Sequence, residues 1–235
     1  MNREEKLLHN YQEVQNALSA ACKRAGRSPQ EVTLLAVTKY AQDGDVLFLL
    51  RQGLLKHVGE SRVQQALNRW QNPDFVSFPT VKHLIGHLQH NKAAKAATFF
   101  DFIDSLDDFS TAVLLDKHVP PQKILRVLVQ VKLTNRDTQS GLPLAKAREL
   151  VHQVRTLSHV RVCGYMAIAP QGAQESELKK LFTQVKQAFD SDFPEGTERY
   201  LSLGMSEDFT IAVEAGSTLP RIGSKLFADD LQEVV

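Results

Sequence analysis

The sequence has too few cysteines for a fold held together by disulfide bonds. Cys22 and Cys163 are the only two in 235 residues, and they do not form a Cys-x-x-Cys pair. Disulfide-rich secreted domains and thiolate zinc sites both need more cysteines at closer spacing. This scarcity is typical of proteins from a reducing compartment, and we expect the protein to be cytoplasmic.

An excess of charge of either sign is lacking as well. The chain has 28 lysines and arginines against 27 aspartates and glutamates, a formal net charge of +1. Because proteins that bind nucleic acid or anionic membranes usually carry a strong basic excess, we expect neither partner. Lys82, Lys92 and Lys95 form only a modest basic cluster, of the kind found on solvated faces. Any anionic ligand must therefore be bound by local groups.

Apolar runs long enough to cross a membrane are missing too. One of the longest, residues 124–131, is interrupted by Arg126 and Gln130, whereas a transmembrane helix needs about 20 apolar residues. The polar residues 1–5 do not resemble the start of a secretory leader, and none is expected. With no linker rich in Gly, Pro or Ser, we expect a single domain over residues 1–235.

What is present begins with an amphipathic segment. Over residues 2–25, apolar side chains that include Leu7, Val14 and Leu18 recur on one helical face, and Gly26 follows as a stop. The sequence therefore predicts an N-terminal helix that packs on the core through this face.

Short apolar runs then alternate with segments of helical period. The predicted strands are residues 32–38, 56–59, 81–86, 100–104, 124–131, 160–168, 200–204 and 220–223. The predicted helices between them are residues 45–51, 62–70, 88–97, 109–117, 144–157, 175–190 and 208–215. Alternation of this kind requires parallel strands, and eight units in this length favour an α/β fold closed into a single (β/α)8 barrel of the TIM type. An open sheet with an odd number of strands is the alternative, because the second and fourth runs are short or weak.

In such a barrel the functional residues follow the strands at their carboxyl ends. Lys39 is the first of them, directly after the run 32–38. Its stem would lie among apolar groups, which favour the neutral amine, and a neutral amine can form a Schiff base. A lysine that merely extends its charge into water at a strand end is the alternative interpretation.

Two segments near the end of the chain predict a phosphate site. Ser206 follows the seventh predicted strand and is placed to cap the helix 208–215, whose first N–H groups can receive a phosphate. After the eighth strand, Gly223 lets the backbone approach a ligand closely and Ser224 begins another short helix. Ordinary capping explains each serine taken alone. Together with Lys39, however, they favour a phosphorylated aldehyde held at both ends.

Three histidines could suggest a metal site. His87 and His90 would share a helical face if a helix began near Gly86, with His83 close by. Because no cysteine or evident carboxylate completes the ligand set, we expect no metal.

Several blocks of sequence, in consistent order between Lys39 and Phe227, resemble the pyridoxal phosphate homeostasis protein family. They are Ala36-Val37-Thr38-Lys39, Gly59-Glu60, His83-Leu84-Ile85-Gly86-His87-Leu88-Gln89, Asn91-Lys92, Leu203-Gly204-Met205-Ser206-Glu207-Asp208, Gly216-Ser217-Thr218 and Arg221-Ile222-Gly223. The resemblance implies a barrel similar to the N-terminal domain of bacterial alanine racemase. It also implies the cofactor pyridoxal 5′-phosphate (PLP), and it explains His83 and His87 as residues of the barrel rim without a metal.

The same resemblance implies a role for each site residue. Lys39 would form the Schiff base, Ser206, Gly223 and Ser224 would receive the phosphate, and Arg221 would face the pyridine nitrogen. A permanently charged guanidinium disfavours protonation of that nitrogen, so the ring would be a weak electron sink. Because members of the family have no established turnover, the expected function is a carrier or regulator rather than an enzyme. Such a protein, expected to be a monomer, would buffer PLP or deliver it to PLP-dependent apo-enzymes.

The chain departs from the family pattern at a few positions. Ser61 stands where an asparagine usually follows Gly59-Glu60, and we expect it to contact the cofactor through water. Tyr165 replaces a smaller or aliphatic residue, and Ala228 replaces a common glycine.

Two enzymatic alternatives use the same lysine. A PLP-dependent amino-acid racemase needs a second acid/base group on the opposite face of its substrate, which here would have to come from Tyr40 or Tyr165. A Schiff-base aldolase would use Lys39 without a cofactor, and the Ser206 and Gly223 loops would bind a sugar phosphate instead.

Overall fold

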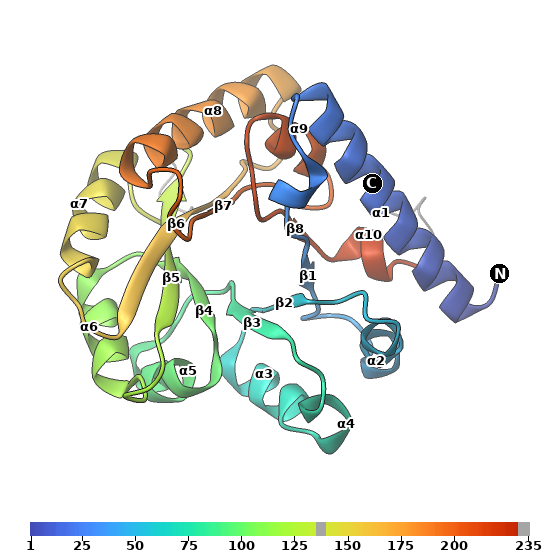
Figure 1. Cartoon of the computed structure of the whole chain (residues 1–235), viewed down its shortest axis with the longest axis horizontal. Helices are drawn as coiled ribbons and strands as arrows, with labels where there is room; N and C mark the ends of the chain where they lie inside the picture. Colours follow the sequence, from blue (N-terminus) through green and yellow to red (C-terminus); the bar gives the residue numbers. More distant parts are fainter. Residues whose placement is uncertain (135–139, 230–235) are drawn as a thin grey trace.

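Parallel strands and outer helices alternate around a nearly closed barrel (Figure 1). The computed structural model describes residues 1–134 and 140–229. Its strands follow the order β7-β6-β5-β4-β3-β2-β1-β8, and all neighbouring strands are parallel. Parallel neighbours need a crossover between them, and each crossover here contains a helix. The predicted (β/α)8 barrel of the TIM type is therefore confirmed.

The strands are short and lie where the apolar runs predicted them, with small shifts at their ends. They are β1 (Leu35–Val37), β2 (His57–Glu60), β3 (Val81–Leu84), β4 (Phe102–Leu106), β5 (Leu125–Lys132), β6 (Val160–Ile168), β7 (Tyr200–Ser202) and β8 (Arg221–Ile222). Because the sheet has eight strands, the alternative with an odd number of strands is excluded.

The helices form the outer layer. They are α1 (Arg3–Arg24), α2 (Asp43–Arg51), α3 (Val63–Trp70), α4 (Pro73–Val76), α5 (Ala93–Phe99), α6 (Phe109–His118), α7 (Leu144–Val154), α8 (Glu175–Asp192), α9 (Phe209–Glu214) and α10 (Ser224–Phe227), with 3-10 turns η1 (Pro29–Glu31) and η2 (His90–Lys92). Within residues 1–134 and 140–229, no helix is both long and apolar enough to span a membrane.

One predicted helix was placed too early in the chain. Residues 88–97 were expected to be helical, but η2 begins only at His90 and α5 at Ala93. Leu88 is buried in the core, so its apolar character reflects packing of an extended segment and not the first turn of a helix. The unpredicted α4 begins with Asn72, whose side chain accepts the Asp74 N–H at 3.0 Å, followed by proline in the first helical position.

The seam between β7 and β8 is closed without a regular ladder. The Arg221 N–H donates to the Gly204 carbonyl at 3.0 Å, and the Thr218 N–H donates to the Leu201 carbonyl at 2.9 Å. Gly204 has a φ of +89°, and a Cβ there would lie 2.6 Å from the Ala212 Cβ. Only glycine therefore lets the chain turn from β7 into α9 at this distance.

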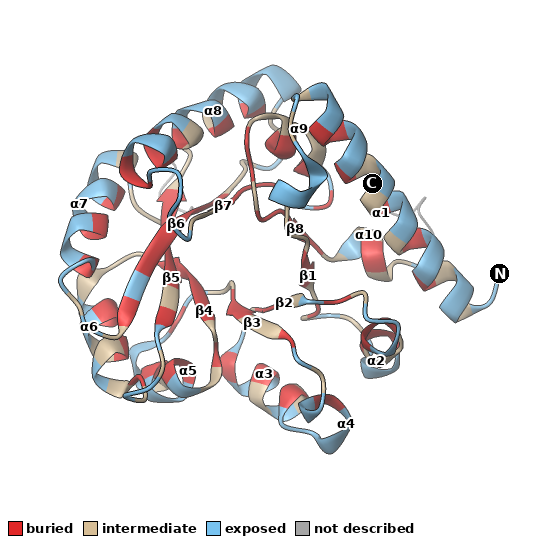
Figure 2. Cartoon of the chain, viewed as in Figure 1, coloured by how far each residue is buried: buried red, intermediate tan, exposed pale blue. Residues whose placement is uncertain are grey.

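The N-terminal helix covers the outer side of this seam. A capping box between Asn2 and Glu5 begins α1, and its buried face, which includes Leu7, Val14 and Leu18, packs on α9 and α10 (Figure 2). Because α9 and α10 are short, α1 supplies the apolar cover that longer crossover helices provide elsewhere. The predicted packing of this helix is confirmed.

Candidate functional site

A pocket of about 1020 Å³ opens at the carboxyl ends of β1, β6, β7 and β8. Five of the predicted site residues line it, namely Lys39, Ser206, Arg221, Gly223 and Ser224. Its volume lies at the upper end of the range for small-molecule sites. Residues that the sequence reasoning placed after three different strands thus share one cavity.

Lys39 enters this pocket from a tight turn after β1. The Ala41 N–H donates to the Thr38 carbonyl at 3.0 Å, which makes Lys39 and Tyr40 the central residues of a β-turn. Lys39 is half-buried, whereas Tyr40 is 90% exposed at the rim. The Lys39 Nζ lies 4.9 Å from the centroid of the Tyr40 ring, and both residues line the pocket.

The opposite wall is formed by the turns after β7 and β8. Ser206 was predicted to cap α9, but this prediction is wrong, because Asp208 occupies the cap position. The Asp208 Oδ1 accepts the Met205 N–H at 2.6 Å and closes a turn before the helix begins. Burial raises the pKa of Asp208. Ser206 lies inside that turn, and its Oγ accepts the Lys225 N–H at 3.4 Å, so the turns after β7 and β8 touch.

The second of these turns begins α10 at Ser224, as predicted. The first N–H groups of a helix have no acceptors within it and can receive an anion. A Cβ on Gly223 would lie 3.1 Å from the Val37 carbonyl oxygen and 3.2 Å from the Val37 Cβ. The glycine thus lets the start of α10 pack closely against the end of β1.

Arg221 forms part of the pocket floor. Its Nη1 donates to the Ser202 carbonyl and hydroxyl, both at 2.8 Å, and its Nη2 donates to the Ala167 carbonyl at 2.9 Å. Burial lowers the pKa of Arg221 to about 10, which leaves the guanidinium charged at neutral pH. These bonds fix the positive charge between β6, β7 and β8.

Three hydrogen-bonded polar side chains lie inside the barrel. The His83 Nδ1 lies 3.0 Å from the Asp104 Oδ1, and its Nε2 lies 3.0 Å from the His57 Nδ1. His83 is fully buried and stacks on Phe102, so its expected place on the barrel rim is wrong. Strand pairing explains the error, because the register of β2, β3 and β4 brings these side chains together inside the barrel.

The structure does not align the three histidines in the way that the metal interpretation requires. His87 and His90 are exposed, and the helix expected to align them does not begin near Gly86. Among residues 1–134 and 140–229, no three His, Cys, Asp or Glu side chains are grouped so that they could hold a metal ion.

Two of the singled-out residues lie apart from the pocket. Ser61 follows β2 but is not among the lining residues; a Cβ on Gly86 would lie 2.2 Å from the Ser61 carbonyl oxygen, so these backbones pack closely. Tyr165 is buried, and its hydroxyl donates to the Asp192 Oδ2 at 2.6 Å. Burial, followed by this hydrogen bond, raises the pKa of Tyr165. This phenol is therefore bound to α8 and does not line the pocket.

The sequence reasoning missed the wall between β6 and α8. Pro170, Gln171, Gly172 and Glu175 line the pocket there. The signal was the Pro-x-Gly segment directly after the sixth predicted strand, which marks a loop at the same end of the barrel.

Comparison with known proteins shows the family of this chain. Residues 4–230 match the family model described as "Alanine racemase, N-terminal domain". The pyridoxal phosphate homeostasis protein of Escherichia coli K12 is 35% identical over 228 residues, which cover 94% of this chain and 95% of that protein. The chain belongs to the pyridoxal phosphate homeostasis protein family. A member from Synechocystis is 33% identical over 86% of this chain and 94% of its own length.

Solved structures agree with this family and with the fold. PipY of Synechococcus elongatus, solved with PLP bound, is 31% identical and has a TM-score of 0.76 over 90% of this chain and 99% of PipY. A protein from Bifidobacterium adolescentis is 25% identical and has a TM-score of 0.85 over 97% of both chains. Alanine racemase of Clostridium difficile, at 11% identity and a TM-score of 0.75 over 97% of this chain and 59% of that one, shares the barrel fold.

Proposed function

We propose that this chain binds PLP as a Schiff base on Lys39 and serves intracellular PLP homeostasis by buffering the free aldehyde or delivering it. One observation carries the proposal: a primary amine, a fixed guanidinium and two serine turns line a single pocket. The family membership supports it, and so does PLP in the PipY structure. In the same proposal the chain is one domain, a monomer in the cytoplasm, and its partners are PLP-dependent apo-enzymes.

The residues present fit the chemical groups of PLP. The Lys39 amine would attack the aldehyde carbon and expel water, and water would reverse the reaction on release. The backbone N–H groups of Gly223 and Ser224 and the hydroxyls of Ser206 and Ser224 would bind the phosphate. Arg221 is held by three hydrogen bonds. Its positive charge would lie near the pyridine nitrogen and disfavour protonation of that nitrogen. Bound PLP supplies an electron sink, which this arrangement weakens.

Ser61 has a smaller part in the proposal. It follows β2 at the same end of the barrel but does not line the pocket. A contact with PLP would therefore run through water, as the sequence reasoning supposed.

The absence of turnover is part of the proposal. Racemisation needs a second acid/base group across the substrate, and of the two tyrosines considered, Tyr165 donates to Asp192 away from the pocket. Tyr40 does line the pocket, but it is 90% exposed at the rim. A phenol this exposed is not held over a bound amino acid, so it is poorly suited to take a proton from one.

Titration of the apo-protein with PLP tests the proposal. We expect saturable uptake with a visible absorption band that borohydride removes, and no loss of chirality when L- or D-amino acids are then added. Racemisation would favour the enzyme. If the wild-type protein takes up no PLP but forms a borohydride-reducible adduct with a sugar phosphate, the PLP proposal is wrong and the aldolase is supported.

A further inference from the structure

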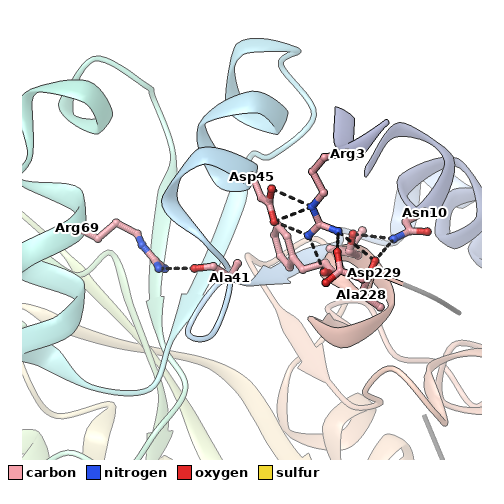
Figure 3. A network of polar contacts seen from close by, with 9 residues as sticks. Arg3, Asn10, Ala41, Asp45, Arg69, Ala228 and Asp229 are labelled. Carbon is pink, nitrogen blue, oxygen red and sulfur yellow. Dashed lines mark hydrogen bonds and ion pairs between the residues drawn. The ribbon is translucent and has the colours of Figure 1, made fainter. Parts of the chain in front are cut away.

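The turn that carries Lys39 is closed by an arginine from a different element. Arg69, in the last turn of α3, donates from Nη1 to the Thr38 carbonyl at 2.6 Å and from Nη2 to the Ala41 carbonyl at 2.8 Å. Figure 3 shows the second of these bonds. Thr38 and Ala41 are the first and last residues of the β-turn. One planar guanidinium therefore links the two ends of the turn.

The guanidinium is itself held by two carboxylates. The Arg69 Nε donates to the Asp43 Oδ1 at 2.7 Å, and Nη1 also donates to the Glu60 Oε1 at 2.9 Å. The Glu60 side chain, 4% exposed, also accepts from the Thr38 hydroxyl at 2.7 Å and from the Trp70 indole at 3.2 Å. With donors in a fixed fork, arginine suits this arrangement better than lysine.

We propose that Arg69 is a positioning residue, which fixes the turn so that the Lys39 amine meets an aldehyde in the pocket. The inference rests on the proposed function of Lys39. Arg69 does not line the pocket, so it acts through the Thr38–Ala41 turn and not by touching the ligand. Its charge is balanced locally by Asp43 and Glu60, which makes the effect one of geometry.

The physical consequence is preorganisation of the amine. Fixing the backbone of each turn residue costs conformational entropy. If Arg69 holds the turn before the ligand arrives, the turn is already ordered, and its entropy loss does not reduce the free energy of Schiff-base formation. A loosened turn should therefore slow Schiff-base formation and weaken binding, while Lys39 and the serine turns keep their chemistry.

The experiment compares Arg69 variants with a matched control in full-length apo-protein. The Arg199 side chain is 21% exposed, against 14% for Arg69. Like Arg69, it donates to a backbone carbonyl, here that of Phe193, and pairs with two carboxylates, here Asp190 and Glu195. Arg199 lies directly before β7, at the opposite end of the barrel from the pocket. The variants are Arg69→Met, Arg69→Lys and Arg199→Met. Each is mixed with PLP while adduct formation is followed by absorbance, and its unfolding midpoint is measured in parallel.

We expect Arg69→Met to form the adduct at least about 10-fold more slowly than wild type, as a misplaced reacting group does. Arg69→Lys should restore part of this rate, and Arg199→Met should react like wild type whatever its stability. Equal rates for wild type and Arg69→Met, or equal slowing in Arg199→Met, would overturn the inference. If Arg69→Met does not fold, Arg69→Lys decides, and a rate equal to wild type overturns it. Wild-type protein that takes up no PLP would instead refute the proposed function.

Discussion

The two sides of the pocket are held in place by different means. On the lysine side, the charged groups of Arg69 and Glu60 fix one four-residue turn from within the barrel wall. On the serine side, α10 is held from outside by α1. The Asn10 Nδ2 donates to the Leu226 and Ala228 carbonyls at 3.2 and 3.1 Å.

Arg3 strengthens this external support. It donates from Nη2 to the Phe227 carbonyl at 2.8 Å and pairs with Asp45 of α2 and with Asp229 (Figure 3). The lysine side thus depends on the hydrogen bonds of one arginine to a buried glutamate, an exposed aspartate and the turn backbone, whereas the serine side depends on a helix that spans the seam. A single substitution should therefore affect the two sides differently.

The largest effect is expected for Lys39→Ala. The variant should lose the borohydride-reducible adduct completely, because no other primary amine stands in that turn, while its unfolding midpoint stays within a few degrees of wild type since Lys39 is only half-buried. Absorbance and mass measurement after reduction check the first point, and circular dichroism checks the second. An undiminished adduct would show that another lysine carries the aldehyde.

A smaller effect is expected for the double variant Ser206→Ala and Ser224→Ala. Removal of both hydroxyls takes two charge-assisted hydrogen bonds from the phosphate, so the Kd for PLP should rise by about 10-fold or more. Pyridoxal, which lacks the phosphate, should bind the variant and wild type equally. If affinity for pyridoxal falls as much as affinity for PLP, the serines act on the fold and not on the phosphate.

Asn10→Leu should act on the serine side through stability. Asn10 is fully buried, and its loss leaves the Leu226 carbonyl without its side-chain donor, so the free energy of unfolding should fall by about 1–3 kcal/mol. PLP affinity should fall as well, because Ser224 is the first residue of α10 and a loosened α10 would hold it less firmly against the phosphate. The rate of Schiff-base formation with pyridoxal, which has no phosphate, should not change. Denaturant unfolding and the two titrations separate these effects. A slower reaction with pyridoxal would contradict the separation of the two sides.

The smallest effect on PLP binding is expected for His57, which does not line the pocket and acts on stability alone. Burial, then the neighbouring His83, lowers the pKa of His57 to about 4, while Asp104 and Asp101 oppose the shift and Arg126 adds to it. Below pH 6.5, His57 binds a proton in the unfolded chain but stays neutral in the folded chain. The free energy of unfolding should therefore fall as the pH drops from 6.5 towards 4. The slope for this single proton cannot exceed about 1.4 kcal/mol per pH unit.

A matched variant isolates that contribution. His57→Asn should remove the loss between pH 6.5 and 4, and the difference between the two unfolding profiles cancels groups common to both, such as Asp208. Parallel profiles for His57→Asn and wild type would show that His57 is protonated equally in the folded and unfolded states.

The sequence predicts features that depend on neighbouring residues better than contacts between residues far apart in the chain. Lys39, Gly223 and Ser224 were found because a strand end and a helix start are local features that also fix the end of the barrel. The cap of α9 was misplaced from Asp208 to Ser206, because both residue types cap helices and only the closed turn at Met205 decides between them.

Contacts that depend on the register and on helix placement were beyond such reasoning. His83 was expected on the rim, because single-strand patterns do not show that β2, β3 and β4 bring His57, His83 and Asp104 together. Nothing in the sequence distinguishes Arg69 from other helical residues, since its bonds to Thr38 and Ala41 depend on how α3 crosses the end of β1. The sequence thus predicted the residues that line the pocket better than the residues that hold them in place.

The most direct test of the Schiff base on Lys39 is to map the modified residue. Wild-type apo-protein is saturated with PLP, reduced with borohydride, digested and analysed by mass spectrometry. We predict one pyridoxyl group per chain, on the peptide that contains Lys39. An unmodified Lys39, with the label on other lysines or nowhere, would contradict the account.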